Sequence, residues 1–97
     1  MSSLDIIRHY GVKTQLKKFN EEAYECIEAI IDLFIASERD YLGVDECKLK
    51  DHAIEEIADV LVVLDGFIDY FDIKREDIEY VKKYKVDRQA NRIANGE

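Results

Sequence analysis

Residues 51–71 read DHAIEEIADVLVVLDGFIDYF, and the apolar positions of this segment cover much of a helix circumference. These positions are Ala53, Ile54, Ile57, Ala58, Val60, Leu61, Val62, Val63, Leu64, Phe67 and Ile68. Their spacing predicts a helix from about Asp51 to Phe71. The breadth of the apolar surface predicts burial on more than one side, which suits a central helix or a helix at a subunit interface.

A second long helix is predicted before this segment, from about Val12 to Arg39, because its apolar residues advance in steps of three and four. They are Leu16, Phe19, Ala23, Cys26, Ile27, Ile30, Ile31, Phe34 and Ile35. Between the two helices, residues 40–50 contain Gly43 and lose this period. We therefore expect a loop from Asp40 to Lys50.

Two further helices are predicted at the ends of the chain. Ser2 or Ser3 can cap a short helix that runs to about Tyr10 and stops at Gly11. The last helix is expected over residues 75–93, with acidic residues in its first turn, where they favour a helix N-terminus. The sequence thus predicts an all-α protein, an antiparallel helical bundle of one short and three longer helices in a single domain, residues 1–97.

The small size of the chain predicts self-association. At 97 residues it is near the size at which the core of a single chain becomes marginal. It contains no proline, which suits long helices with few breaks. The helix over residues 51–71 is too broadly apolar for so small a chain to cover. We therefore expect a homodimer, or a dimer of dimers such as a homotetramer, that completes the bundle.

Charge and composition exclude several classes of partner. The net charge of −8 argues against binding to a DNA or RNA polymer, which requires a basic surface. No apolar run approaches the length of a membrane span. The N-terminus, MSSLDIIRHYG, does not resemble a secretion leader, and Cys26 and Cys47 lack metal-binding spacing. We expect a cytoplasmic protein with reduced thiols.

Two acidic clusters interrupt the long helices. Their members are Glu21, Glu22 and Glu25 in the first, and Glu55, Glu56 and Asp59 in the second. Residues three or four apart share a helix face, so two antiparallel helices can bring both clusters together. A glutamate-rich helix usually presents a solvated face. Carboxylates on a mostly apolar helix are costly unless compensated, however, and this pattern predicts a bound cation.

The residue types in these clusters narrow the choice of metal. Di-iron sites in helical bundles use Glu-x-x-His pairs, and neither cluster has a histidine three residues after a glutamate. His52 precedes the second cluster, and the roles of His52 and Glu55 stay open. Oxygen ligands alone favour Mg²⁺, with Mn²⁺ as a possible substitute.

The last predicted helix has a face that begins apolar and becomes basic. Its members are Ile78, Val81, Lys85, Arg88 and Arg92. Two interpretations stay open. Either Val86, Ala90 and Ile93 take over the packing and the basic residues meet water, or the basic residues hold the phosphates of a metal-bound substrate.

The segments FNEEAYECIEAI, IEEIADVLVVLDGFI and KVDRQANRI resemble the MazG-like all-α nucleoside triphosphate pyrophosphohydrolases. The family motif, E-E-x-x-E followed by E-x-x-D, is matched by Glu21, Glu22, Glu25, Glu56 and Asp59. The resemblance extends from about His9 to Ile93. Thirty residues separate Glu25 from Glu56, at or beyond the long end of the usual spacing, which leaves the exact pairing of the helices open.

This resemblance implies a hydrolase that converts a (d)NTP and water to the monophosphate and pyrophosphate, and so clears the nucleotide pool. It implies that Mg²⁺ is held by Glu22, Glu25, Glu56 and Asp59. It also implies that Glu21 orients or deprotonates the attacking water. The residues expected to hold phosphates are Lys85, Arg88 and Arg92.

Other functions and the contacts to the base stay open. One alternative is an enzyme like phosphoribosyl-ATP pyrophosphohydrolase, which resembles the same superfamily. Another is a non-catalytic helical module that binds nucleotides or assembles with other chains. The base-binding residues are unknown, with candidates in Tyr10, Gln15, Phe19 and Tyr24.

Overall fold

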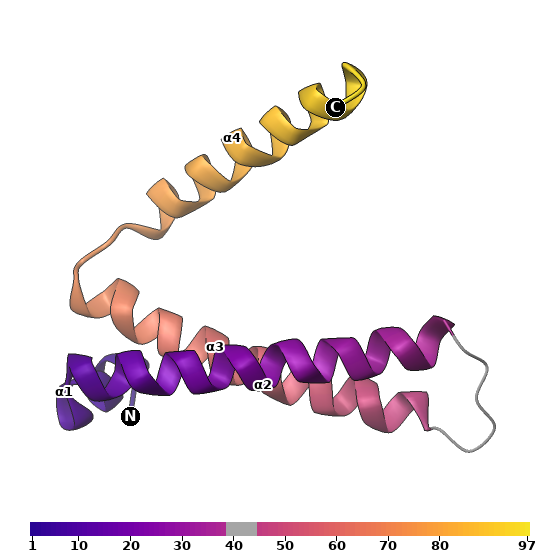
Figure 1. Cartoon of the computed structure of the whole chain (residues 1–97). Coiled ribbons are helices and arrows are strands. Elements are labelled where there is room, and N and C mark those ends of the chain that lie inside the picture. Colours follow the sequence, from indigo (N-terminus) through magenta and orange to yellow (C-terminus); the bar gives the residue numbers. More distant parts are fainter. Residues whose placement is uncertain (39–44) are drawn as a thin grey trace.

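The computed structural model of the 97-residue chain describes residues 1–38 and 45–97. These residues form four helices and no strand, which confirms the all-α class. The helices are α1 (Ser3–Tyr10), α2 (Val12–Glu38), α3 (Glu46–Tyr70) and α4 (Arg75–Ala94). As Figure 1 shows, α2 and α3 lie side by side, α1 packs at one end of this pair, and α4 projects away from it.

The boundaries of α1 follow from its two ends. Ser2 caps the helix, because its Oγ accepts a hydrogen bond from Asp5 N at 3.2 Å while its own N–H donates to Asp5 Oδ2 at 2.8 Å. At the other end Gly11 has a φ of 89°, a conformation that glycine adopts without strain. The chain therefore turns sharply at Gly11, and α1 folds back beside the helices that follow.

The predicted start of the third helix was wrong. The helix begins at Glu46 rather than Asp51, because Asp45 caps it: its side chain accepts a hydrogen bond from Lys48 N at 3.2 Å. The first turn of α3 contains few apolar residues, so the apolar spacing in the sequence did not indicate that the helix starts there. The rest of the predicted loop, residues 40–44 with Gly43, lies outside the described residues.

Small residues allow the helices to approach closely. Ala29 of α2 and Ala53 of α3 are both buried in the core of the helical pair. Ile7 of α1 is 1% exposed and packs beside Gly66 of α3. A Cβ atom at Gly66 would lie 3.1 Å from the carbonyl oxygen of Ser3. This glycine therefore sets how closely α1 can approach α3.

We expect Gly66→Val to lower the free energy of unfolding by about 1–3 kcal/mol, because overpacking forces α1 away from α3. Urea unfolding followed by circular dichroism measures this change. Ala58→Val is the matched control, because Ala58 is exposed on the same helix and should lose only about 0.5 kcal/mol of helix propensity. Equal effects of the two substitutions would contradict the proposed contact.

The start of α4 is fixed by an ion-pair cluster, while the rest of the helix is open. Arg75 donates to Asp69 Oδ1 at 2.9 Å and to Asp65 Oδ1 at 3.2 Å, which ties the first turn of α4 to the last turns of α3. Beyond this point α4 has no buried residue. Within one chain, therefore, the packed bundle consists of α1, α2 and α3.

The projecting helix gives the chain an open shape. The radius of gyration of the chain is 17.3 Å, whereas a compact chain of this length has a radius of about 12.5 Å. Its accessible surface is 7975 Å², whereas a folded monomer of this mass exposes about 5,700 Å². Both cysteines are free, and none of the four described helices is long and apolar enough to cross a membrane.

Candidate metal centre

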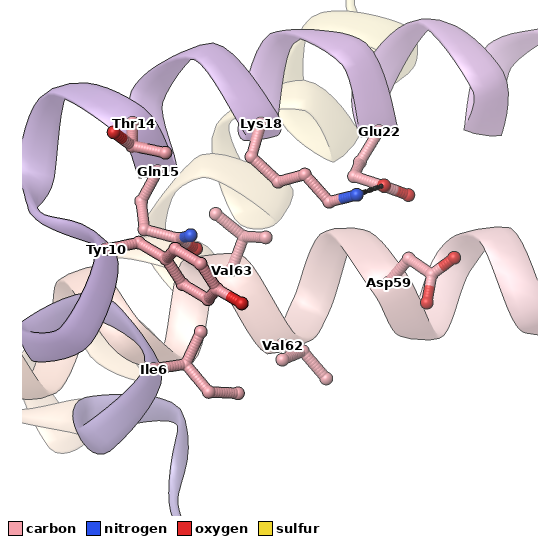
Figure 2. A pocket seen from close by; sticks show the side chains of 9 residues that line it. All are labelled: Ile6, Tyr10, Thr14, Gln15, Lys18, Glu22, Asp59, Val62 and Val63. Carbon is pink, nitrogen blue, oxygen red and sulfur yellow. Dashed lines mark ion pairs between the residues drawn. The ribbon is translucent and has the colours of Figure 1, made fainter.

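Three carboxylates from two helices meet at one point of the bundle. Glu22 of α2 faces Glu56 and Asp59, which lie one turn apart on α3. One oxygen from each side chain lies within 4.8 Å of the others. Figure 2 shows Glu22 and Asp59 on facing sides of the space between the helices. All three residues belong to the ligand set predicted from the sequence.

The negative charge of this cluster is only partly compensated. The side chains of Glu22 and Glu56 are 7% and 12% exposed. The Oε2 atom of each is buried without a hydrogen-bond partner among the described residues. Such orphaned acceptors are costly in a protein interior. The available oxygen donors and their missing partners fit a hard divalent cation such as Mg²⁺.

Glu56 is the carboxyl group most affected by this environment. Burial raises its pKa above the usual value, because the charged form loses hydration. The charges of Glu25, Asp59 and Glu22 raise the pKa further. His52 acts in the opposite direction, with its Nε2 atom 3.9 Å from Glu56 Oε1. A bound cation would relieve the same repulsion that disfavours the Glu56 carboxylate.

The other acidic residues lie around this cluster rather than in it. Glu25 is exposed, but its charge is near enough to affect the pKa of Glu56, so it lies beside the centre. Glu21 and Glu55 are also exposed. That Glu25 is a fourth metal ligand, and that Glu21 acts in catalysis, stay predictions.

The three basic residues predicted to hold phosphates lie on α4, away from the acidic cluster of the same chain (Figure 1). Lys85, Arg88 and Arg92 are all exposed. Lys85 shares a groove with Ile78 and Val81, as the predicted stripe requires. A single chain does not bring this stripe to the carboxylates, and its phosphate role stays a prediction.

A cavity of about 470 Å³ opens beside the carboxylates, between α1 and the helical pair. Its lining residues are Ile6, Tyr10, Thr14, Gln15, Lys18, Glu22, Asp59, Val62 and Val63. Two of the four base-binding candidates, Tyr10 and Gln15, are among them. The ring of Phe19 instead packs edge-on against that of Phe67, and Tyr24 is exposed.

Lys18 is a charged residue of the cavity wall that was not predicted from the sequence. Its Nζ atom lies 2.8 Å from Glu22 Oε1, and this hydrogen bond raises the pKa of Lys18. The sequence does contain a signal for this pair, because Lys18 lies four residues before Glu22 and residues at this spacing share a helix face. Lys18 therefore supplies the positive charge nearest to Glu22.

We expect Lys18→Met to bind Mg²⁺ about five- to tenfold more tightly, because the ammonium group competes with the metal for the charge of Glu22. Calorimetric titration with Mg²⁺ alone measures this affinity. Lys17→Met is the control, because Lys17 is exposed and does not line the cavity. Weaker Mg²⁺ binding by Lys18→Met would show that the lysine supports the centre instead.

A comparison of the chain with known protein families, curated proteins and solved structures found no match.

Proposed function

We propose that this protein is a cytoplasmic, Mg²⁺-dependent nucleoside triphosphate pyrophosphohydrolase of the MazG-like type that clears (d)NTPs from the nucleotide pool. The observation that carries this proposal is the meeting of Glu22, Glu56 and Asp59 with two buried, unpartnered carboxylate oxygens. A cavity with a lysine in its wall lies directly beside them. Negative charge arranged for a cation, next to space for an organic ligand, suits hydrolysis of a metal-bound phosphate ester or anhydride.

Different residues of the chain have separate roles in the proposed reaction. Glu22, Glu56 and Asp59 hold the cation, with Glu25 as a further ligand from the exposed side. Mg²⁺, when bound, lowers the pKa of water and offsets charge on the phosphates. Glu21 orients or deprotonates the attacking water. Lys18 lines the cavity beside Glu22, where it can contact a phosphate oxygen.

Self-association completes the proposal. The accessible surface of 7975 Å² exceeds that of a compact monomer of this mass by about 2,200 Å². An obligate dimer buries a comparable area on each partner. We therefore propose a homodimer or a dimer of dimers in which a second copy covers the open faces of the chain.

The surface proposed to be covered is an apolar stripe on each long helix. Its exposed large residues are Leu16, Ile27, Ile30 and Phe34 on α2, and Ile54, Ile57 and Leu61 on α3. They recur mostly at steps of three and four, so each set lies on one side of its helix. In this assembly Lys85, Arg88 and Arg92 of one copy hold the phosphates at the carboxylates of another.

A pyrophosphate-release screen tests this function. Purified protein with Mg²⁺ is offered all canonical NTPs and dNTPs, several damaged nucleotides and phosphoribosyl-ATP. Release of pyrophosphate and a nucleoside monophosphate from one or more (d)NTPs supports the proposal. Turnover of phosphoribosyl-ATP alone would assign the rival activity, and no turnover across the panel would favour a non-catalytic module.

A further inference from the structure

We propose that the end of the cavity away from the carboxylates is a nucleobase site in which the Gln15 amide reads the hydrogen-bonding edge of the base. This inference rests on the proposed function, since it identifies which part of a nucleotide occupies which part of the cavity. It also assigns a role to two residues whose contribution the sequence left open, Tyr10 and Gln15.

The cavity has two chemically different ends. Glu22 and Asp59 lie at one end of the cavity. Lys18 lies next to them, one turn before Glu22 on α2 (Figure 2). At the other end are Ile6, Tyr10, Thr14, Gln15 and Val63. A nucleotide has the same polarity, with anionic phosphates at one end and a flat, largely apolar base at the other. The volume of about 470 Å³ is in the range of small-ligand sites in proteins.

Gln15 is the residue that makes the second end a binding site rather than a gap. It is 7% exposed, and its side-chain amide makes no hydrogen bond with another described residue. Gln15 lines the cavity, and neither atom of its amide is among the buried side-chain atoms that lack a partner, so the amide is open to the cavity and free to hydrogen-bond a polar ligand. Tyr10 contributes a ring beside it, and a base has a flat face that packs well against an aromatic ring (Figure 2).

The chemistry of the amide determines what the site accepts. A glutamine offers one donor and one acceptor, and rotation of its terminal group presents them in either order. Each common base has an adjacent donor and acceptor on its pairing edge. The site therefore distinguishes a nucleotide from a sugar phosphate, while it accepts more than one base. This is the selectivity expected of an enzyme that clears several nucleotides.

Replacing the amide by a carboxylate should change this selectivity in one direction. The carboxylate introduced by Gln15→Glu would only accept hydrogen bonds when ionised. Guanine presents two neighbouring donors, N1–H and N2–H, which match a carboxylate. Adenine presents a donor beside the acceptor N1, which a carboxylate repels. Gln15→Glu should therefore shift the ratio of affinities toward guanine over adenine by about tenfold or more.

The test is an equilibrium titration of the full chain with dAMP, dGMP, dCMP, dTMP and ribose 5-phosphate, followed by amide chemical shifts. No metal is added and no turnover is needed, so the result is independent of whether the protein hydrolyses triphosphates. We expect the wild type to bind the four nucleotides at least about tenfold more tightly than ribose 5-phosphate, because a base fills the apolar end. The perturbed amides should include those of Tyr10, Thr14 and Gln15.

Two variants complete the test. Gln15→Glu should shift the ranking toward dGMP, as above. Tyr10→Leu, at an exposed position that should preserve folding, should weaken all four nucleotides about fivefold without changing their ranking. Equal binding of ribose 5-phosphate and nucleotides would overturn the proposal. So would an unchanged ranking in folded Gln15→Glu, or, if that variant does not fold, unchanged affinities in Tyr10→Leu.

Discussion

Glu56→Gln is expected to reduce pyrophosphate release by about a hundredfold or more while it raises the melting temperature of the metal-free protein. The loss follows from the removal of one of the three clustered carboxylates that are proposed to hold the cation. The melting temperature rises because that same carboxylate destabilises the metal-free protein. Glu56 is mostly buried, one of its oxygens has no partner, and neighbouring charges repel it.

The gain in stability should depend on pH in a defined direction. The pKa of Glu56 is raised in the folded state, so the folded protein binds this proton more tightly than the unfolded chain does. The wild type therefore loses stability as the pH rises from the pKa of Glu56 in the unfolded chain through its pKa in the folded protein. This stability stays lost at pH 7. Glutamine cannot lose a proton. The advantage of Glu56→Gln should be full at pH 7 and disappear below about pH 4.

Thermal melts in EDTA and in Mg²⁺, together with the hydrolysis assay, measure these effects. Mg²⁺ should stabilise the wild type and have much less effect on Glu56→Gln, because a ligand stabilises the state that binds it. Glu55→Gln is the matched control, since it removes an exposed carboxylate one residue away. A Glu56→Gln protein that hydrolyses at the wild-type rate, or that melts below the wild type in EDTA, would contradict the proposed centre.

Ile30→Glu combined with Ile57→Glu is expected to convert the proposed oligomer to a monomer. Both side chains are exposed in the single chain, at 46% and 41%, within the apolar stripes of α2 and α3. A charge buried without a partner in a subunit interface costs several kcal/mol. The mass in solution should fall from a multiple of 11.3 kDa to that of one chain.

Light scattering at micromolar concentration measures this change. Asp32→Lys serves as the control, because it alters the charge of an exposed position on α2 outside the apolar stripe. The monomeric variant should also lose hydrolysis, since the phosphate-binding residues are proposed to come from another copy. A wild-type protein that is already monomeric would contradict this assembly, and so would a double variant that retains the wild-type mass.

Much of the fold and the centre was predictable from the sequence because both depend on helical periodicity. The apolar steps of three and four placed α2 correctly, and Gly11 placed the end of α1. The two acidic clusters offered six carboxylates, and the resemblance to the MazG-like family selected Glu22, Glu25, Glu56 and Asp59 among them. The structure brings three of these four, Glu22, Glu56 and Asp59, close together. The apolar spacing did not predict the start of α3 at Glu46, because a capping residue starts this helix before its apolar residues begin.

The remaining features depend on distances between helices, which no local pattern contains. The sequence by itself determined that the chain is helical and that its two acidic clusters can face each other, because both follow from residues three and four apart on one helix. Only the tertiary structure decided which carboxylate oxygens lose their partners, and that Gln15 lines a cavity beside Tyr10. Only the tertiary structure, likewise, separates α4 from its own bundle (Figure 1). The physical reason is that burial, desolvation and cavity shape arise where separate helices meet, and the close approach of α1 at Gly66 sets one wall of that space.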